Sequence, residues 1–514
     1  MKNIDKTNSN ILANKRILIF LQRGWGLNIG QFLAKKLQQQ NCRLAGLTLK
    51  RSLHQYMLKQ AEVKYDLLIN NDEIMSRPKD YLKGEHYDLK HICEQLGVDS
   101  IWPIVSTLRN HVRSYKDKYY YSFKQNVSDQ DIIDYVMAVY KYILYFFENF
   151  NPDLIISPNF VALPHIMFHL YAKKRGVKML AVTDCKVRGV FIFTHSYQDN
   201  EGKFYTHIDN LNDNKITSPN SKKAKAYIAQ FRQKFIKPSY VSDRSNKASL
   251  VKKIKHELAP YYHSLRFIIK PPINVLKSTG ITGDYKPPRI LLRDHYAHKK
   301  YKRFANKYSY YPFDKLKKFV YFPLQFQPEA TIDVAAPYFT NQIEVARLLA
   351  MSLPDDYTLV VKDHPEMVGL RSDSYLEKIA RTVNVKLIDY RIPNENIIKK
   401  TSLIISPSGT TIAEASFYYK PVIQLGNLGT TQKLPNVFKH TDLTTISGLI
   451  KKLLNTNLKT SDYDQKLENY IAAAYDVGFD ADYLKAWTKG DKTEMEKLWT
   501  VYKNEIKNIF EHKT

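Results

Sequence analysis

Short apolar runs of strand character alternate with helical segments along this chain, and they do so in two separate series. In the first series the strand candidates are Lys15–Leu21, Leu44–Leu49, Asn151–Pro158 and Val177–Val182. Helical periodicity lies between two of them, over Ala162–Arg175. Alternation of this kind is typical of a parallel sheet that is covered by helices.

The second series opens after Pro287 and Pro288. Its strand candidates are Arg289–Leu292, Phe319–Pro323, Tyr357–Lys362, Val385–Ile388, Leu403–Ser406 and Pro421–Leu425. A chain of 514 residues is too long for one ordinary hydrophobic core. We therefore predict an α/β protein with two Rossmann-like domains that face a cleft, followed by a helical C-terminal tail.

The predicted boundaries follow changes in composition. We place the first domain at residues 1–235, a helical linker at 236–285, the second domain at 286–440 and the C-terminal helices at 441–514. The linker segment is basic and contains Pro271 and Pro272.

The charge of the chain favours anionic partners. Its 78 Lys and Arg residues against 50 Asp and Glu residues give a formal net charge of +28. Nucleotide phosphates, acidic glycans and anionic lipids all suit such a surface, although lysine-rich composition can also reflect the base bias of a genome. The sequence has no zinc-finger spacing and no long basic tail, so we do not expect a nucleic-acid partner.

Cysteine usage and hydropathy bear on the compartment. Cys42, Cys93 and Cys185 lie far apart, which favours a reduced cytoplasmic protein without disulfides or structural metal. The segment Met1–Lys15 is polar and lacks the apolar core of a signal peptide, and Tyr140–Phe150 is too short to span a bilayer. If the protein works at a membrane, we expect it on the inner face as a peripheral protein.

Three motifs follow predicted strands of the second series, and together they predict a phosphate site. They are Tyr321–Glu329, Val360–Glu366 and Ile404–Ala415. Where a strand gives way to a helix, free backbone N–H groups and the helix dipole favour an anion. In the third motif, Ser408, Gly409, Thr410 and Thr411 supply small and hydroxyl-bearing residues for such a site; the alternative is a capping box between Thr411 and Glu414.

The second motif contributes charge. We predict that Pro365 opens a helical turn and leaves His364 at an N-cap position that is aimed into the cleft. His364 and Lys362 could then pair with phosphate or assist a leaving group, although a structural histidine is the alternative. Glu329, in the first motif, could accept a hydrogen bond from a sugar hydroxyl or pair with a lysine.

Polar candidates in the first domain are fewer. Gly24, Gly26 and Gly30 do not fit the dinucleotide spacing G-x-G-x-x-G, so we interpret Gln22–Gly30 as a glycine-bearing turn with Arg23, Gly24, Trp25 and Gly26 facing an acceptor. Asp184 is a candidate for the catalytic base; the alternative is that it is an ordinary surface carboxylate without a catalytic role. His165 and His169 lack a third ligand, so we interpret them as packing or surface residues and predict no metal site.

The ordered set FPLQFQPE, VVKDHPE and ISPSGTTIAEASFYYKPVIQLG resembles bacterial glycosyltransferases of capsule and surface polysaccharide biosynthesis. That group is of the two-domain GT-B type, includes Kdo transferases, and is similar to bacterial polysialyltransferases in its His-Pro element. The resemblance is strongest over residues 319–426. The chain lacks the E-x7-E pair of many retaining GT-B enzymes. The resemblance therefore does not say whether the reaction retains or inverts the anomeric configuration, or which residue is the catalytic base.

The resemblance implies specific roles. His364 and Pro365 match the element that holds the donor phosphate, Ser408–Thr411 the loop that completes the pocket, and Glu329 the acidic end of the PLQ–PE segment. The expected substrates are a nucleotide sugar, such as a CMP- or UDP-sugar, and an oligosaccharide, polysaccharide or glycolipid acceptor, without a bound cofactor. A nucleotide-sugar epimerase, a polyol-phosphate transferase and a basic non-enzymatic protein that binds acidic glycan or lipid are the alternatives.

Overall fold

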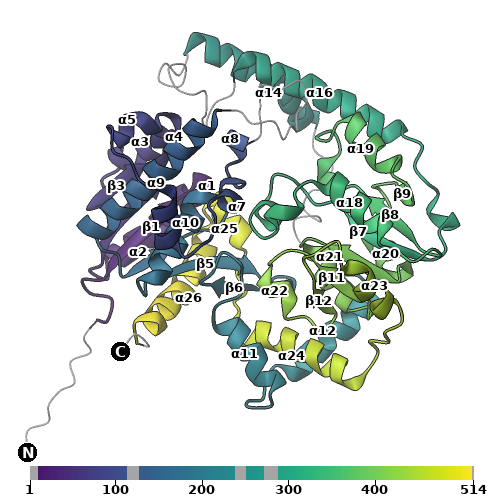
Figure 1. Ribbon diagram of the computed structural model, residues 1–514. Helices are drawn as coiled ribbons and strands as arrows, with labels where there is room; N and C mark the ends of the chain where they lie inside the picture. The colour runs from purple at the N-terminus through teal and green to yellow at the C-terminus, as the bar shows by residue number, and fades with distance from the viewer. Residues whose placement is uncertain (1–9, 113–126, 238–249, 271–286, 512–514) are drawn as a thin grey trace, which may run out of the picture.

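The computed structural model describes residues 10–112, 127–237, 250–270 and 287–511. They form two six-stranded sheets, each flanked by helices, with a pair of long helices outside both (Figure 1). The prediction of two Rossmann-like α/β domains with a helical C-terminal region is confirmed. The strand order is β3-β2-β1-β4-β5-β6 in the first sheet and β12-β11-β10-β7-β8-β9 in the second, so both have the doubly wound order 3-2-1-4-5-6.

The first sheet is parallel except for its last strand. Its strands are β1 (Arg16–Leu21), β2 (Arg43–Thr48), β3 (Leu67–Asn70), β4 (Leu154–Ile156), β5 (Lys178–Asp184) and the antiparallel β6 (Phe191–Thr194). In β1 five consecutive residues are buried because helices cover both faces of the sheet. Its helices are α1 (Arg23–Trp25), η1 (Gly26–Gly30), α2 (Gln31–Gln38), α3 (Arg51–Lys59), α4 (Asn71–Ser76), α5 (Pro78–Leu82), α6 (Leu89–Leu96), α7 (Trp102–Val105), α8 (Arg109–Val112), α9 (Asp129–Asn149) and α10 (Leu163–Lys174).

All six strands of the second sheet are parallel. They are β7 (Phe319–Pro323), β8 (Thr358–Lys362), β9 (Val385–Ile388), β10 (Leu403–Ser406), β11 (Val422–Gln424) and β12 (Val437–Lys439). The helical segments here are η2 (Phe313–Lys315), α17 (Ala330–Asp333), η3 (Pro337–Phe339), α18 (Gln342–Met351), η4 (Pro365–Met367), α19 (Asp373–Ala380), α20 (Asn394–Lys400), α21 (Thr410–Ser416), α22 (Gly429–Gln432) and α23 (Ile446–Leu454).

The C-terminal helices return to the first domain. These are α25 (Tyr483–Lys489) and α26 (Lys492–Glu511), and Leu498, Tyr502 and Ile506 pack in one buried cluster with Ile17 and Ile19 of β1. One face of the first sheet is therefore covered by the last residues of the chain, as the yellow helices in Figure 1 show.

A third hydrophobic cluster joins the two domains. It contains α11 (Lys203–Asn212), α12 (Ser221–Gln233) and α24 (Ser461–Val477), together with Phe417 from the second domain. Because this cluster is apolar and buried, it stabilises the contact between the two domains.

Three sequence interpretations are corrected. The predicted strand Arg289–Leu292 is the start of helix α16 (Pro288–Lys307), where Pro288 occupies the first turn and needs no hydrogen-bond partner. The expected glycine turn at Gln22–Gly30 is helical, because α1 and η1 follow β1 directly. Strands β3, β6 and β12 were not anticipated. Of the predicted linker, residues 238–249 and 271–286 lie outside the described residues, and the rest includes helix α14 (Leu250–Ile269).

Candidate functional site

One loop of the second domain, residues 324–331, connects the parts of the predicted site. It follows β7, which lies between β8 and β10 in the sheet, and the order of strands reverses at β7 and β10. In open α/β sheets ligands bind beyond the carboxyl ends of the strands at this point. The other two motifs follow β8 and β10, so all three reach the same edge of the second sheet.

Gln325 joins this loop to the turn after β10. Its side-chain amide donates to Ser406 Oγ at 3.1 Å, and a Cβ atom at position 409 would lie 2.8 Å from Gln325 Oε1. Gly409 has φ +104°, a conformation that favours glycine, and Ser408 Oγ donates to the carbonyl of Thr331. The loop therefore packs directly on the predicted phosphate turn.

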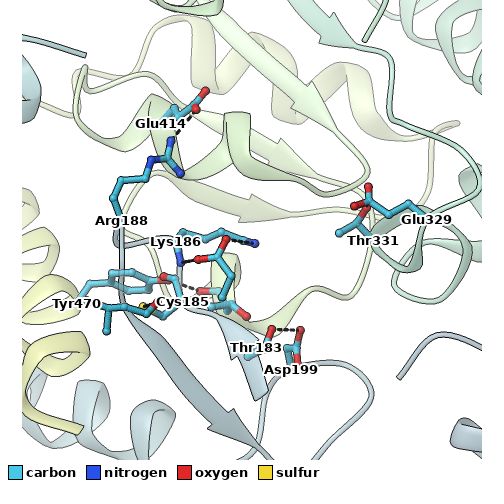
Figure 2. A network of polar contacts seen from close by, with 12 residues as sticks. Thr183, Cys185, Lys186, Arg188, Asp199, Glu329, Thr331, Glu414 and Tyr470 are labelled. Carbon is cyan, nitrogen blue, oxygen red and sulfur yellow. Dashed lines mark hydrogen bonds and ion pairs between the residues drawn. The ribbon is translucent and has the colours of Figure 1, made fainter. Parts of the chain in front are cut away.

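The capping-box alternative for Thr411 and Glu414 is wrong. Gly409 is the N-cap of α21, and no side chain caps the helix. The two oxygens of Glu414 are instead occupied by Arg188 Nη2 of the first domain at 2.8 Å and Asn394 Nδ2 at 2.7 Å. Glu414 thus ties the two domains together (Figure 2).

His364 occupies the predicted N-cap position. Pro365 opens the short helix η4, and His364 Nδ1 accepts a hydrogen bond from the backbone N–H of Glu366 at 3.2 Å. Because Nδ1 is an acceptor, a neutral ring carries its proton on Nε2. The ring is half-buried, and its centroid lies 5.8 Å from that of Phe326 in the connecting loop.

A buried ion pair fixes the turn before His364. Arg371 donates to Asp363 Oδ1 and to the backbone carbonyl of Gln325, and both charged side chains are 2% exposed. Asp363 Oδ1 also accepts the backbone N–H of His364 at 2.8 Å. Burial raises the pKa of the Asp363 carboxyl, and Arg371 opposes that rise. Arg371 therefore holds the β7 loop and the His364 turn in register, a role that the sequence did not reveal.

Lys362 lies beneath this turn. Its side chain is buried, and Nζ donates to the carbonyl of Ile392 at 3.0 Å. Burial lowers the pKa of Lys362 to about 8, although Glu414 and Asp363 act in the opposite direction. The amine is thus close to a change of charge near neutral pH.

In the first domain, Lys186 lies among carboxylates at the end of β5. Asp184 Oδ1 accepts the backbone N–H of Lys186 at 2.7 Å, and Oδ2 lies 3.2 Å from Lys186 Nζ (Figure 2). Burial alone would lower the pKa of Lys186, but Asp184, Asp199 and Glu329 raise it above its usual value. Lys186 is therefore under the influence of carboxylates from both domains.

Asp199 was missed by the sequence analysis. It accepts a hydrogen bond from Thr183 Oγ1 at 3.0 Å, and burial raises its pKa to about 6, with Thr183 and Lys186 opposing that rise. It lies on a turn after β6, and the carbonyl of the neighbouring Gln198 accepts the backbone N–H of Gly429 in the second domain. No local pattern marks this aspartate, because only the fold brings it near Lys186.

A cavity of about 440 Å³ lies at the carboxyl edge of the first sheet. Loops after β1, β2, β3 and β4 form most of it, and residues 328–331 of the connecting loop close one side. Arg23, Lys50 and Arg109 are cationic groups in its wall, and Glu329 is an acidic one. Neither His364 nor the turn at 408–411, both of which the structure describes, lines this cavity; the connecting loop joins the cavity to them.

The predicted acceptor residues 23–26 divide into two groups. Arg23 lines the cavity. Trp25, in contrast, is fully buried and its Nε1–H donates to the hydroxyl of Tyr483 in α25 at 2.7 Å, so it does not face an acceptor. Gly24 packs near Trp487, and Gly26 permits close contact with the backbone of Leu21. These two glycines serve packing.

His165 and His169 are packing residues, as interpreted from the sequence. Burial lowers the pKa of His165 to about 3 and that of His169 to about 4, so both are neutral. His165 Nε2 lies 3.0 Å from Gln22 Oε1 in the wall of the cavity. Within the described ranges, no group of three or more His, Cys, Asp or Glu residues is arranged to hold a metal ion.

Comparisons with known proteins give distant likenesses only. No family model matches the chain, and no curated protein matches it. Among solved structures, the beta Kdo 2,7 transferase KpsC of Thermosulfurimonas dismutans is 11% identical, over 73% of this chain and 90% of that chain, with a TM-score of 0.34. UDP-GlcNAc 2-epimerase from Neisseria meningitidis is 13% identical, over 90% and 98%, with a TM-score of 0.26. The calicheamicin glycosyltransferase CalG4 is 12% identical, over 92% and 98%, with a TM-score of 0.25. Likenesses this distant do not assign a function to this chain.

Proposed function

We propose that this protein is a glycosyltransferase, which moves a sugar from a nucleotide-activated donor to a saccharide acceptor. One observation carries the proposal: the loop at residues 324–331 contacts both His364 and the turn at 408–409, and also forms a wall of the cavity in the first domain. A donor bound on the His364 side of this loop and an acceptor bound in the cavity on its other side would meet between the two doubly wound sheets.

The donor phosphate is assigned to the second domain. His364 Nε2–H, the backbone at 408–411 and the protonated Lys362 would stabilise charge on the leaving phosphate. The acceptor is assigned to the cavity beside Arg23. In the transfer, an acceptor hydroxyl attacks the anomeric carbon, the bond from that carbon to the phosphate oxygen breaks, and the phosphate leaves with the electron pair.

The hydroxyl proton requires a base, and Asp199 is the better candidate of two. Both oxygens of Asp184 are engaged by Lys186, whereas Asp199 accepts a hydrogen bond from Thr183 at Oδ2 and has a pKa of about 6, so it is ionised at neutral pH. Neither aspartate lines the cavity, so the attacking hydroxyl would have to extend out of it, past the connecting loop. A general base is most effective when its pKa lies near the pH at which the enzyme works. We expect kcat/KM to fall as pH drops through about 6, because protonation removes the base.

The pair of variants Asp199→Asn and Asp184→Asn tests this assignment. Asp199→Asn should lower kcat by about 100-fold or more and abolish the acidic limb of the pH profile, while Asp184→Asn retains that limb. A reversed result would assign the base to Asp184.

The test of the proposed function is a thermal-shift screen of CMP, UDP, GDP and CDP on the full chain. A nucleotide that binds the folded state raises Tm, by an amount that corresponds to about 2.7 kcal/mol at a hundred times its Kd. We expect one nucleotide to do so, and His364→Ala to remove most of the shift. His86→Ala, an exposed histidine of the first domain, is the matched control and should leave it intact.

Two outcomes would contradict the proposal. A nucleotide shift that is unchanged in His364→Ala would remove the phosphate role of this residue. Conversion of the nucleotide sugar to an epimer without any acceptor would favour an epimerase.

The lowered pKa of Lys362 predicts that nucleotide binding depends on pH. Its folded pKa of about 8 lies below its unfolded value of 10.5, so the unliganded protein gains stability as pH rises from about 8 toward 10.5. An anion beside this amine should bind more weakly over the same range, because the positive charge is lost. The nucleotide Kd should therefore rise as pH increases through about 8.

Lys362→Met should remove that dependence. The matched control is Lys439→Met, because burial also lowers the pKa of Lys439 to about 8 and β12 lies four strands away from β8. If Lys362→Met keeps the full pH dependence, Lys362 does not contact the phosphate.

A further inference from the structure

Helices α14 (Leu250–Ile269) and α16 (Pro288–Lys307) form a pair outside both sheets, along the top of Figure 1. They are antiparallel, since Glu257 pairs with Lys299 at 2.5 Å and Tyr261 contacts Tyr296 at 2.7 Å. The face of α14 toward α16 includes the buried Ser264 and the partly buried Phe267. Most of the other described side chains of α14 are exposed, and Tyr261 lies at the border between the two faces.

The outward face of α14 is strongly apolar. Eight large hydrophobic side chains of this helix are exposed, for example Ile254 at 57%, Leu265 at 57% and Ile268 at 67%. The eight are Val251, Ile254, Leu258, Tyr261, Tyr262, Leu265, Ile268 and Ile269. Their spacing of three or four residues places them on one stripe of about 120° of the helix circumference. A stripe this long is unusual on a protein surface and marks an interaction site.

Positive charge accompanies the apolar stripe. Helices α14 and α16 contain eleven Lys and Arg residues against two acidic residues. Lys255, Arg266 and Lys270 are exposed on one side of the stripe, and the acidic Glu257 is paired with Lys299. A helix with an apolar face bordered by cations is typical of a helix that lies in the interface of an anionic bilayer.

We propose that α14 docks this protein on an anionic lipid surface, with the stripe among the acyl chains and the cations at the head groups. A second copy of the chain is a poorer occupant, because two such helices would bring their positive charges together without acidic partners. No helix in the described part of the chain is long and apolar enough to cross a membrane, and α14 would lie flat on it. The inference does not depend on the proposed glycosyl transfer.

The test is co-sedimentation of the full chain with vesicles. We expect binding to vesicles that contain 30% phosphatidylglycerol in phosphatidylcholine, little binding to phosphatidylcholine alone, and weaker binding at higher salt. The variant I254S/L265S/I268S should bind the anionic vesicles at least tenfold more weakly. A charge variant, K255E/R266E, should also bind anionic vesicles at least tenfold more weakly. Its weak binding to phosphatidylcholine vesicles should not change.

A matched control separates the stripe from general surface hydrophobicity. L58S/Y338S/V383S removes three other exposed hydrophobic side chains and should bind vesicles as the parent protein does. Both triple variants should keep the Tm and any nucleotide shift, because the altered side chains are exposed. Full vesicle binding by I254S/L265S/I268S would overturn the proposal, as would a parent dimer that this variant converts to a monomer while neither binds vesicles.

Discussion

Replacing Arg371 with methionine is expected to lower the free energy of unfolding of the second domain by about 3–5 kcal/mol. The substitution leaves the Asp363 carboxylate buried without its guanidinium partner, and it removes the hydrogen bond to the carbonyl of Gln325. Chemical denaturation followed by near-UV circular dichroism measures this change. Nucleotide binding should fall with it, because Gln325 and the His364 turn lose their common support.

Two further variants sharpen that result. Arg381→Met breaks an ion pair to Glu377 in which the arginine side chain is 79% exposed, so it should change stability by less than about 1 kcal/mol. The double variant D363L/R371M should be more stable than R371M alone, because no unpaired charge stays buried. If R371M costs no more than R381M, the buried pair does not organise the turn.

Replacing Gly409 with alanine is expected to abolish nucleotide binding, with at least a 100-fold rise in Kd. The added Cβ atom would lie 2.8 Å from Gln325 Oε1, and the backbone at φ +104° disfavours any side chain, at a cost of about 1–3 kcal/mol. Relaxation would move the turn at 408–411, which is the part of the site assigned to the phosphate. Isothermal titration with the nucleotide found by the thermal-shift screen measures the loss.

Gly84→Ala is the control for backbone strain. Gly84 has φ +86° and has nothing within 4 Å of an added Cβ atom, so the variant reproduces the strain without the contact. It should lower Tm modestly and leave the nucleotide Kd unchanged. Equal Kd values for the parent protein and Gly409→Ala would show that the turn at 408–411 does not hold the ligand.

Five of the six strands of the second sheet could be predicted to within one residue at each end, whereas β12 was not, and physical reasons explain both the success and its limits. Strands β7, β9 and β10 have the predicted bounds because each is a short, mainly apolar and buried run between polar turns. The run Ile290–Leu292 has the same composition but belongs to α16, since a short apolar run does not by itself distinguish a strand from a helix. Pro288, which precedes this run, occupies the first turn of α16, a position that favours proline.

The site was predictable where it is local and not where it depends on tertiary contacts. The N-cap position of His364 follows from the His-Pro pair and is confirmed. The bridge between Arg188 and Glu414 joins residues 226 positions apart, and Asp199 owes its raised pKa to burial in the assembled fold. Contacts of this kind leave no pattern in the sequence of either partner.

The return of α25 and α26 to the first sheet has a consequence for biosynthesis. A ribosome releases Ile17 and Ile19 early, but Leu498 and Tyr502, which cover them, emerge only after the whole second domain has been synthesised. During that interval an apolar surface of the nascent chain stays open to water and to other proteins. The amino-terminal domain can thus complete its core only after the second domain has been synthesised, although its own first strand is made first.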